Sequence, residues 1–373
     1  MIPKRSACHI LILAVVLLAQ PAWGWSTKEH ILLTRLAIAR LLADDQTPPP
    51  MKQWLRDADP GNLDMEALED YYLHSRQGII PRGVDGLPYW SVVPDLEALI
   101  SRPRDVVAPF NVHERLLHYL DVEFFDPHQQ ERTDDQKPLF KADLSARPAA
   151  ADFPRDHTDA RYQQAGMLPV RVEQTYHRLV AALRAGRLND QPGQFPRDDH
   201  AAKWAGFLAH YVADNTQPHH STVDYRSRTY FPNPARAPDV HAQLEYKLVD
   251  DENDDYLETR KLVWELLVQK LEMVEDPVGT EDIWTGSVLT SLQAYDALPL
   301  IGQAARAAWQ PNTPSDRSWE DGIIHTPTFY THQGQWREKP STVAEMKAHQ
   351  MALAVHRIAA HLRQAWEAAH NAE

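Results

Sequence analysis

Residues 204–220 read WAGFLAHYVADNTQPHH, and this stretch decides the fold class. Apolar side chains recur in it at helical spacing, which predicts an amphipathic helix. His210 and Asp214 lie four residues apart, so the helix presents a ring nitrogen and a carboxylate oxygen on one face. Pro218 cannot continue a helix, so the chain turns there and brings His220 back towards the helix end.

The rest of the chain repeats this helical pattern. Convincing strands with period-two alternation are absent, so we expect an all-α fold with one multi-helix domain over residues 25–373. Three prolines at 48–50 should end the first helix. Predicted helices cover residues 30–44, 65–75, 112–121, 170–185, 200–215, 241–252, 256–274, 283–308 and 343–369.

Two stretches are predicted to be long loops, 125–167 and 220–239. The second contains YRSRTYFPNPARAPD, which is too rich in proline and arginine for a helix interior. Long ordered loops are often functional. The side chains of Arg226, Arg228, Tyr230 and Phe231 can clamp a phosphate and stack on a base, or the loop can be a solvated flap.

Residues 1–24 have the pattern of a secretion signal. Lys4 and Arg5 precede a short apolar run, and small residues at 22 and 24 predict cleavage before Trp25. The run is too short for an ordinary transmembrane helix. An uncleaved anchor is the alternative. We therefore expect an exported protein, periplasmic or secreted, without a stable transmembrane anchor.

The composition limits which metal ligands and which nucleic-acid-binding surfaces the chain can have. The single cysteine, Cys8, lies inside the predicted signal, so the mature chain has no disulfide and no thiolate ligand. The net charge of −14 argues against a broad basic groove for duplex nucleic acid. The chain has 19 histidines, and without thiolates it can bind zinc only through nitrogen and oxygen.

Further candidate ligands lie outside the first stretch. His241 and Glu245 repeat the four-residue spacing on a later predicted helix. His30, His118 in LLHYLD and Asp95 in WSVVPD are isolated candidates. Either pair alone is typical of a solvated helix surface. Two pairs and an intervening Pro-His-His turn in a histidine-rich chain favour a metal site.

Taken in order, these motifs resemble the superfamily of zinc-dependent phospholipases C and S1/P1-type nucleases. A Trp is followed five residues later by a His, at Trp25 and His30. His118-Tyr119, with Asp121 nearby, resembles the HY/HF motif. Residues 210–220 match HxxxDxxxPxH in its HYxxDxxQPxH form, and residues 241–245 match HxxxE. The motifs extend over residues 25–245.

The resemblance implies an all-helical domain that holds three zinc ions. The implied ligands are Asp95, His118, His210 and Asp214 for one ion; His220, His241 and Glu245 for a second; and His30, a bridging Asp214 and the terminal amine and carbonyl of Trp25 for the third. Asp105 is the alternative to Asp95. Signal cleavage before Trp25 would create that amine.

The resemblance also implies in-line attack on phosphorus by a zinc-activated water, with Asp95 and Asp214 as catalytic carboxylates. Tyr119 would stack on a base. Gln217 and Tyr119 favour the nuclease branch, whereas Glu245 is typical of the phospholipase branch. The nucleases' disulfides are absent. The positions of the choline pocket hold Lys28, Leu96 and Arg115, which lack the aromatic and acidic groups that choline requires.

The sequence therefore predicts a zinc phosphodiesterase that acts on single-stranded nucleic acid or nucleotides. A phospholipase C for head groups other than choline is the alternative. A non-catalytic exported zinc-binding protein is the third hypothesis. No protein partner is implied.

Overall fold

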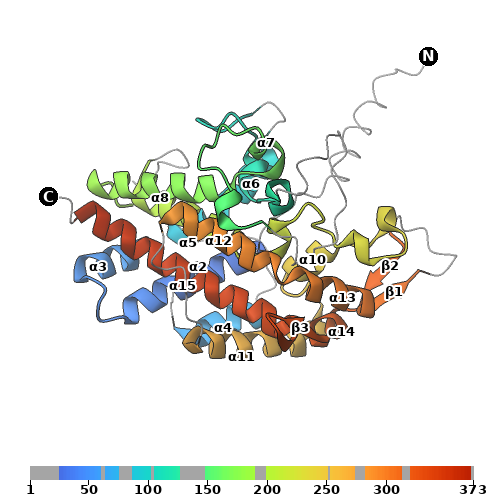
Figure 1. The fold of residues 1–373 in the computed structure, drawn as a ribbon. Helices are drawn as coiled ribbons and strands as arrows, with labels where there is room; N and C mark the ends of the chain where they lie inside the picture. The colour runs from blue at the N-terminus through green and yellow to red at the C-terminus, as the bar shows by residue number, and fades with distance from the viewer. Residues whose placement is uncertain are drawn as a thin grey trace, which may run out of the picture.

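The computed structural model describes residues 25–59, 64–74, 86–101, 105–126, 148–189, 199–250, 253–273, 282–312 and 320–370. The predicted signal over 1–24 lies outside the described residues. The described chain is mainly helical, as expected, and helices dominate the view in Figure 1. The predicted all-α class is therefore confirmed at the level of helical content.

The α-helices are α2 (Thr27–Ala43), α3 (Pro49–Ala58), α4 (Met65–His74), α5 (Leu87–Trp90), α6 (Val93–Ile100), α7 (Tyr162–Ala165), α8 (Leu168–Arg184), α9 (Ala201–Asp214), α10 (Val240–Glu245), α11 (Leu257–Met273), α12 (Ile283–Tyr295), α13 (Leu298–Ala308), α14 (Thr326–Thr331) and α15 (Val343–His370). Short 3-10 turns are η1 (Glu114–Leu117), η2 (Val122–Phe125), η4 (Ala150–Asp152), η5 (Pro218–Ser221), η6 (Arg228–Tyr230), η7 (Pro234–Arg236) and η8 (Asp254–Tyr256).

Proline accounts for two differences from the predicted helices. The prolines at 48–50 do not only end a helix, because Pro49 and Pro50 begin α3. The first turn of a helix tolerates proline, since its N–H groups have no partner within the helix. Likewise, the helix predicted over 283–308 is two helices, and Pro299 lies in the first turn of α13.

Three other predictions were wrong. The helix predicted over 241–252 ends early, because α10 stops at Glu245 and residues 246–250 form turns. The helix predicted over 112–121 is only the single turn η1, and the chain turns again at His118. Short strands are present: β1 (Trp309–Pro311) pairs antiparallel with β2 (Gly322–Ile324), and β3 (Gln333–Trp336) with β4 (Lys339–Thr342). These strands have three or four residues, too few for a visible alternating pattern.

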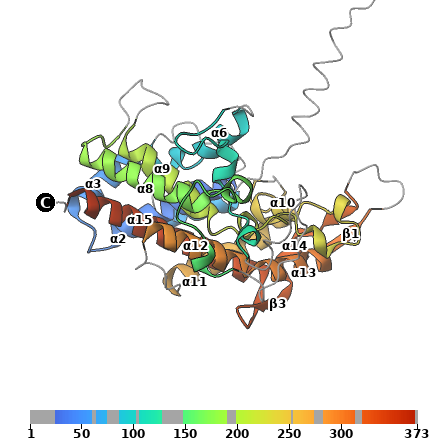
Figure 2. The same ribbon diagram turned by 45° about the horizontal axis from the view of Figure 1, so that its top comes forward.

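The long helix α15 organises the core. It contacts α2, α8, α9 and α11, and Figures 1 and 2 show it crossing the middle of the molecule. Most of the buried apolar side chains of the described residues belong to one cluster that extends from Trp25 to Trp366. The expectation of a single domain over residues 25–373 stays a prediction.

A glycine allows α5 to approach α9. A Cβ atom at Gly206 would lie 2.4 Å from Cβ of Trp90 and 2.7 Å from the Leu87 carbonyl oxygen. Any larger residue would therefore push the two helices apart. The close approach brings the carbonyl oxygen of Ser91 within 2.8 Å of Nδ1 of His210. Packing at Gly206 thus orients a candidate ligand.

A buried lysine on α15 contacts two segments that carry candidate ligands. Lys347 Nζ lies 2.7 Å from Glu29 Oε1, and neither side chain is exposed. The same ammonium donates a 2.7 Å hydrogen bond to the carbonyl oxygen of Leu244. Glu29 precedes His30 on α2, and Leu244 precedes Glu245 on α10. Lys347 therefore holds both segments against the core.

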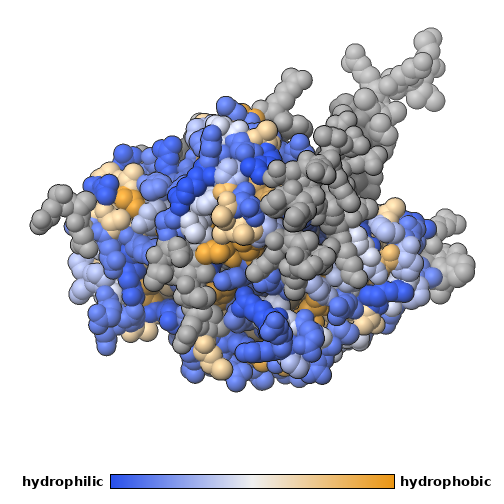
Figure 3. Space-filling model, viewed as in Figure 1, coloured by the Kyte–Doolittle hydropathy of each residue, from blue (hydrophilic) through white to orange (hydrophobic). Residues whose placement is uncertain are grey.

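The surface drawn in Figure 3 is mostly hydrophilic. Apolar exceptions include Leu99 and Ile100 on α6, which are 49% and 77% exposed. Among the described residues, no helix has the length and apolar character needed to cross a membrane.

Replacing Lys347 tests the buried ion pair. Lys347→Met leaves the Glu29 carboxylate buried without its partner, so we expect a loss of about 3–5 kcal/mol in the free energy of unfolding. Urea unfolding measures this loss. The double variant Glu29→Gln/Lys347→Met removes both charges and should recover most of the stability. A single variant as stable as the parent would show that the pair does not support the fold.

Candidate metal centre

The end of α9 is the centre of the site. His210 and Asp214 lie one helical turn apart, and Nε2 of His210 is 3.1 Å from Oδ2 of Asp214. Neither side chain is exposed. The turn η5 follows, with Pro218 in its first position and Gln217 capping it through a hydrogen bond from the His219 backbone N–H. The predicted helix, stop and return of the chain are all present.

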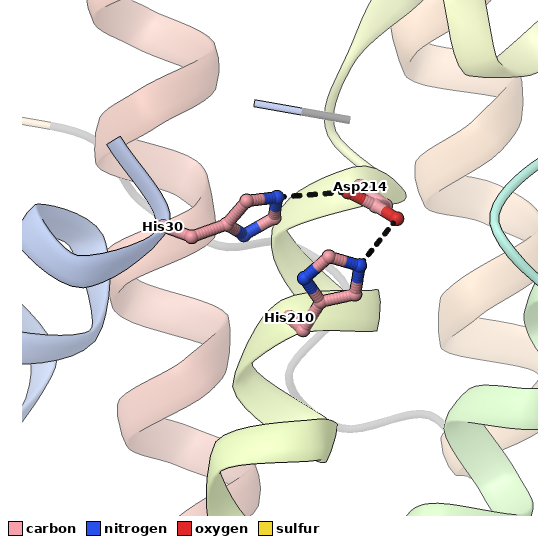
Figure 4. Close-up of side chains that lie close together, drawn as sticks. All are labelled: His30, His210 and Asp214. Carbon is pink, nitrogen blue, oxygen red and sulfur yellow. Dashed lines mark ion pairs between the residues drawn. The ribbon is translucent and has the colours of Figure 1, made fainter. Parts of the chain in front are cut away.

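His30 approaches from α2, whose amino terminus is capped by the Ser26 hydroxyl. The His30 ring stacks on His210 with centroids 4.1 Å apart, and its Nε2 is 3.2 Å from Oδ1 of Asp214. Figure 4 shows both imidazoles directed at the same carboxylate. Residues far apart in sequence thus meet at Asp214.

Asp95 and His118 complete this cluster. Asp95 lies in the first turn of α6, and its Oδ1 is 3.5 Å from His118 Nδ1 and 3.6 Å from His210 Nε2. Asp105, the alternative ligand, is exposed and lies outside the cluster. The structure therefore brings Asp95, not Asp105, to the other candidates.

Two overlapping groups of buried side chains can hold a metal ion: His30, His210 and Asp214, and Asp95, His118 and His210. In each group the ligand atoms all lie within 4.8 Å of one another. Tetrahedral zinc requires nitrogen or oxygen ligands about 2.0–2.2 Å from the ion, so atoms this close to one another can converge on one cation.

The second predicted set lies beside the first. His220 Nδ1 is 3.9 Å from Asp214 Oδ2, and the His220 and His241 rings meet edge to face with centroids 5.3 Å apart. His241 Nε2 is 2.7 Å from Glu245 Oε2, and all three side chains are buried. Among the described residues this set does not form a group as tight as the two above.

Trp25 is buried against the end of α9. Its indole Nε1 donates to the carbonyl oxygen of Ala213, 3.0 Å away, and to Oγ1 of Thr216, 3.1 Å away. The predicted first residue of the mature chain therefore lies beside the helix end that carries Asp214.

The predicted substrate residues have packing partners. Tyr119 is half-buried, and a Cβ atom at Gly166 would lie 2.7 Å from its Cδ2, so the ring rests on that glycine. Lys28 is buried and donates a 2.8 Å hydrogen bond to the carbonyl oxygen of Tyr72. In the loop 220–239, Arg226 pairs with Glu320, and Phe231 packs against Trp309. A phosphate clamp at Arg226 would have to displace a carboxylate.

Burial, neighbouring charges and hydrogen bonds shift the pKa values of the cluster's side chains, some upwards and some downwards. Burial raises the pKa of Asp95 to about 8, against the effect of the His210 charge. Burial would also raise the pKa of Asp214, but His210 and the hydrogen bond from His118 hold it well below its usual range. Burial lowers the pKa of His30 to about 3. Burial lowers the pKa of His210, but Asp214 and Asp95 outweigh it and raise the pKa to about 9.

The pKa of Glu245 is also shifted, which indicates that its carboxylate would be stabilised by a nearby positive charge. Burial raises its pKa well above the usual value, and repulsion from Asp95 and Asp214 raises it further. A buried carboxylate is stable when it is paired or coordinates a metal. A bound cation would stabilise Glu245 and the neighbouring carboxylates together.

Several buried polar atoms of the cluster make no hydrogen bond. They are Nδ1 and Nε2 of His30, Oδ2 of Asp95, Nε2 of His118 and Oδ1 of Asp214. Buried polar groups in folded proteins almost always have a partner. These atoms include the types that ligate zinc, so the residues present fit a metal ion.

Comparison of the chain with protein-family models, with curated proteins and with solved structures found no match. The functional assignment therefore depends on the residues of this chain and their geometry.

Metal binding should be visible as thermal stabilisation. A ligand that binds only the folded state at 100 times its Kd adds about 2.7 kcal/mol, so Zn²⁺ should raise the melting temperature. Asp214→Asn should lose most of this increment and most of the bound metal in elemental analysis. Asp159→Asn, which changes a carboxylate paired with Arg161 near the surface, is the control and should keep both. An equal increment in the two variants would contradict the assignment.

Proposed function

We propose that this chain is an exported zinc-dependent phosphodiester hydrolase with a fold of the phospholipase C and S1/P1 nuclease type. The observation that carries the proposal is the convergence of His30, Asp95, His118, His210 and Asp214 in one buried cluster. These residues come from separate segments, and their motifs follow the order of that superfamily. Their convergence supports a common role for all of them.

In this proposal, each side chain of the cluster has its own chemical role. Zinc bound here would activate a water as nucleophile near neutral pH and polarise a phosphate ester. Asp214 orients the His118, His210 and His30 rings through contacts of 3.0–3.2 Å. Asp95 Oδ2 makes no hydrogen bond, and it would accept a proton from the attacking water once a bound cation had lowered the pKa of Asp95 from about 8. His220, His241 and Glu245 supply the ligands of the adjoining site.

Single-stranded nucleic acid or a nucleotide is the preferred substrate class. Tyr119 directly follows His118, and a base stacked on such an aromatic gains about 1–3 kcal/mol. Gln217 no longer discriminates between the branches, because its side chain caps η5 and so has a structural role. The Lys28 ammonium is bound to a backbone carbonyl where choline recognition would require a carboxylate.

A phospholipase C remains the second candidate. Two observations favour it. Glu245 is the last candidate ligand, and α6, which carries Asp95 in its first turn, exposes Leu99 and Ile100 at 49% and 77%. An apolar surface beside the site suits a lipid aggregate.

Hydrolysis assays separate these candidates. With zinc, the chain from Trp25 should cleave single-stranded DNA or RNA and leave phospholipid vesicles intact. His210→Ala should lower the rate by about 10³-fold or more, since a metal ion contributes several kcal/mol to transition-state stabilisation. His325→Ala, at an exposed histidine, is the control.

Release of diacylglycerol without nuclease activity would move the assignment to the phospholipase branch. Zinc binding without any phosphodiester hydrolysis would leave a non-catalytic zinc-binding protein. Undiminished hydrolysis by His210→Ala would place the active site elsewhere.

The terminal amine gives a separate prediction. A chain that begins at Trp25 should bind one more zinc ion than a chain that retains residues 23 and 24, because a peptide nitrogen cannot replace an amine as ligand. The longer chain should also lose most of its activity. Metal per chain and hydrolysis rate measure both effects. Equal values for the two chains would remove the amine from the ligand set.

A further inference from the structure

Two candidate ligands are oriented by backbone carbonyls. A histidine that binds a metal uses one ring nitrogen and usually donates the other N–H to an acceptor, which fixes the tautomer and ring direction. Nδ1 of His210 donates to the carbonyl oxygen of Ser91, 2.8 Å away. Nδ1 of His220 donates to the carbonyl oxygen of His118. Both rings therefore keep Nε2 as the nitrogen that can bind a metal ion.

His118 is oriented the other way round. Its Nδ1 faces the cluster, 3.0 Å from Asp214 Oδ2 and 3.5 Å from Asp95 Oδ1. Its Nε2 is buried and makes no hydrogen bond. The side chain that faces this nitrogen is Glu114, with Oε1 4.0 Å away.

Glu114 is held in place as a buried carboxylate. It is 3% exposed and begins η1, four residues before His118. Arg171 Nη2 from α8 lies 3.3 and 3.5 Å from its two oxygens. The Tyr211 hydroxyl from α9 donates to Oε1. Since Tyr211 follows His210, the network joins η1 to the ligand-bearing helix.

We propose that Glu114 is a positioning residue for the metal centre: it accepts the Nε2–H of His118 when Nδ1 binds the metal. The proposal rests on the metal site of the proposed function and does not depend on which substrate is cleaved. The 4.0 Å gap exceeds a hydrogen bond of about 2.9 Å by about 1 Å, which side-chain rotation can close.

The physical effect is specific to one ring nitrogen. A carboxylate that accepts Nε2–H stabilises the tautomer with a bare Nδ1 and makes that nitrogen a stronger donor to the metal. A purely structural Glu114 would only neutralise the buried Arg171 guanidinium. The two roles differ in what happens when both charges of the Glu114–Arg171 pair are removed.

The experiment measures zinc affinity directly, by competition of each folded variant with a chromophoric chelator. Glu114→Gln should weaken one zinc site by about 10–100-fold. The double variant Glu114→Gln/Arg171→Met has no unpaired buried charge and should unfold, without added zinc, at a temperature close to that of the parent, yet retain the loss of affinity. Glu97→Gln, on neighbouring α6, is the control and should bind zinc like the parent.

A double-mutant cycle assigns the effect to His118. In a His118→Ala background, Glu114→Gln should cause no further loss of zinc affinity. Parental affinity in the charge-neutral double variant would overturn the proposal, and so would an undiminished effect of Glu114→Gln in the His118→Ala background. If Glu114→Gln alone does not fold, the double variant decides.

The readout separates this proposal from the proposed function. A parent chain that binds zinc but cleaves no phosphodiester would remove the hydrolase assignment and leave the test of Glu114 intact. A parent chain that binds no zinc would overturn both.

Discussion

The structure depends on keeping one carboxylate, Asp214, inside the protein. Its side chain is not exposed, and nitrogens of His118, His210 and His30 lie 3.0, 3.1 and 3.2 Å from its oxygens. A buried anion is stable only with close positive or hydrogen-bonding partners. His118, which donates a hydrogen bond, and His210, whose pKa is raised to about 9, must therefore meet Asp214 at the end of α9. The fold can be understood as the solution to that requirement.

The surrounding packing serves the same arrangement. Gly206 lets α5 approach α9, so that the carbonyl of Ser91 can orient His210. Lys347 holds the residues that precede His30 and Glu245. Glu114, bound by a buried arginine and a tyrosine, faces His118 from the opposite side to Asp214. His210 and the segments of His30 and Glu245 thus have support from residues that are distant in the chain, whereas Glu114 lies only four residues before His118.

Local sequence pattern was enough to predict several helices and the course of the chain around Asp214. Periodicity located α8, α9, α11 and α15 to within two or three residues, because long amphipathic helices carry their signal in adjacent turns. The spacing within 210–220 predicted a helix, a stop and a return, and the structure has all three. The order of the motifs along the chain identified the residues that meet in the cluster. The three-zinc arrangement and the hydrolase chemistry stay predictions.

Other features could not be predicted from local pattern. The sequence favoured Asp95 through its VVPD context but left Asp105 as an alternative. The structure distinguishes them, because Asp95 is buried in the first turn of α6 and Asp105 is exposed. The prolines at 48–50 can end one helix or begin the next. Glu114 had a visible signal in its four-residue spacing to His118, but that spacing is common on solvated helices. Its burial depends on Arg171 and Tyr211, which no local pattern connects to it.

The position of Lys347 has a consequence for the timing of assembly. A ribosome makes the chain from its amino terminus, so His30 and the other candidate ligands up to Glu245 exist before α15 does. The ammonium that contacts Glu29 on α2 and the Leu244 carbonyl on α10 belongs to Lys347, which is made well after Glu245. A nascent chain shorter than this helix would carry every candidate ligand and still lack the pair that holds two of their segments together. Completion of the site is therefore coupled to the synthesis of α15.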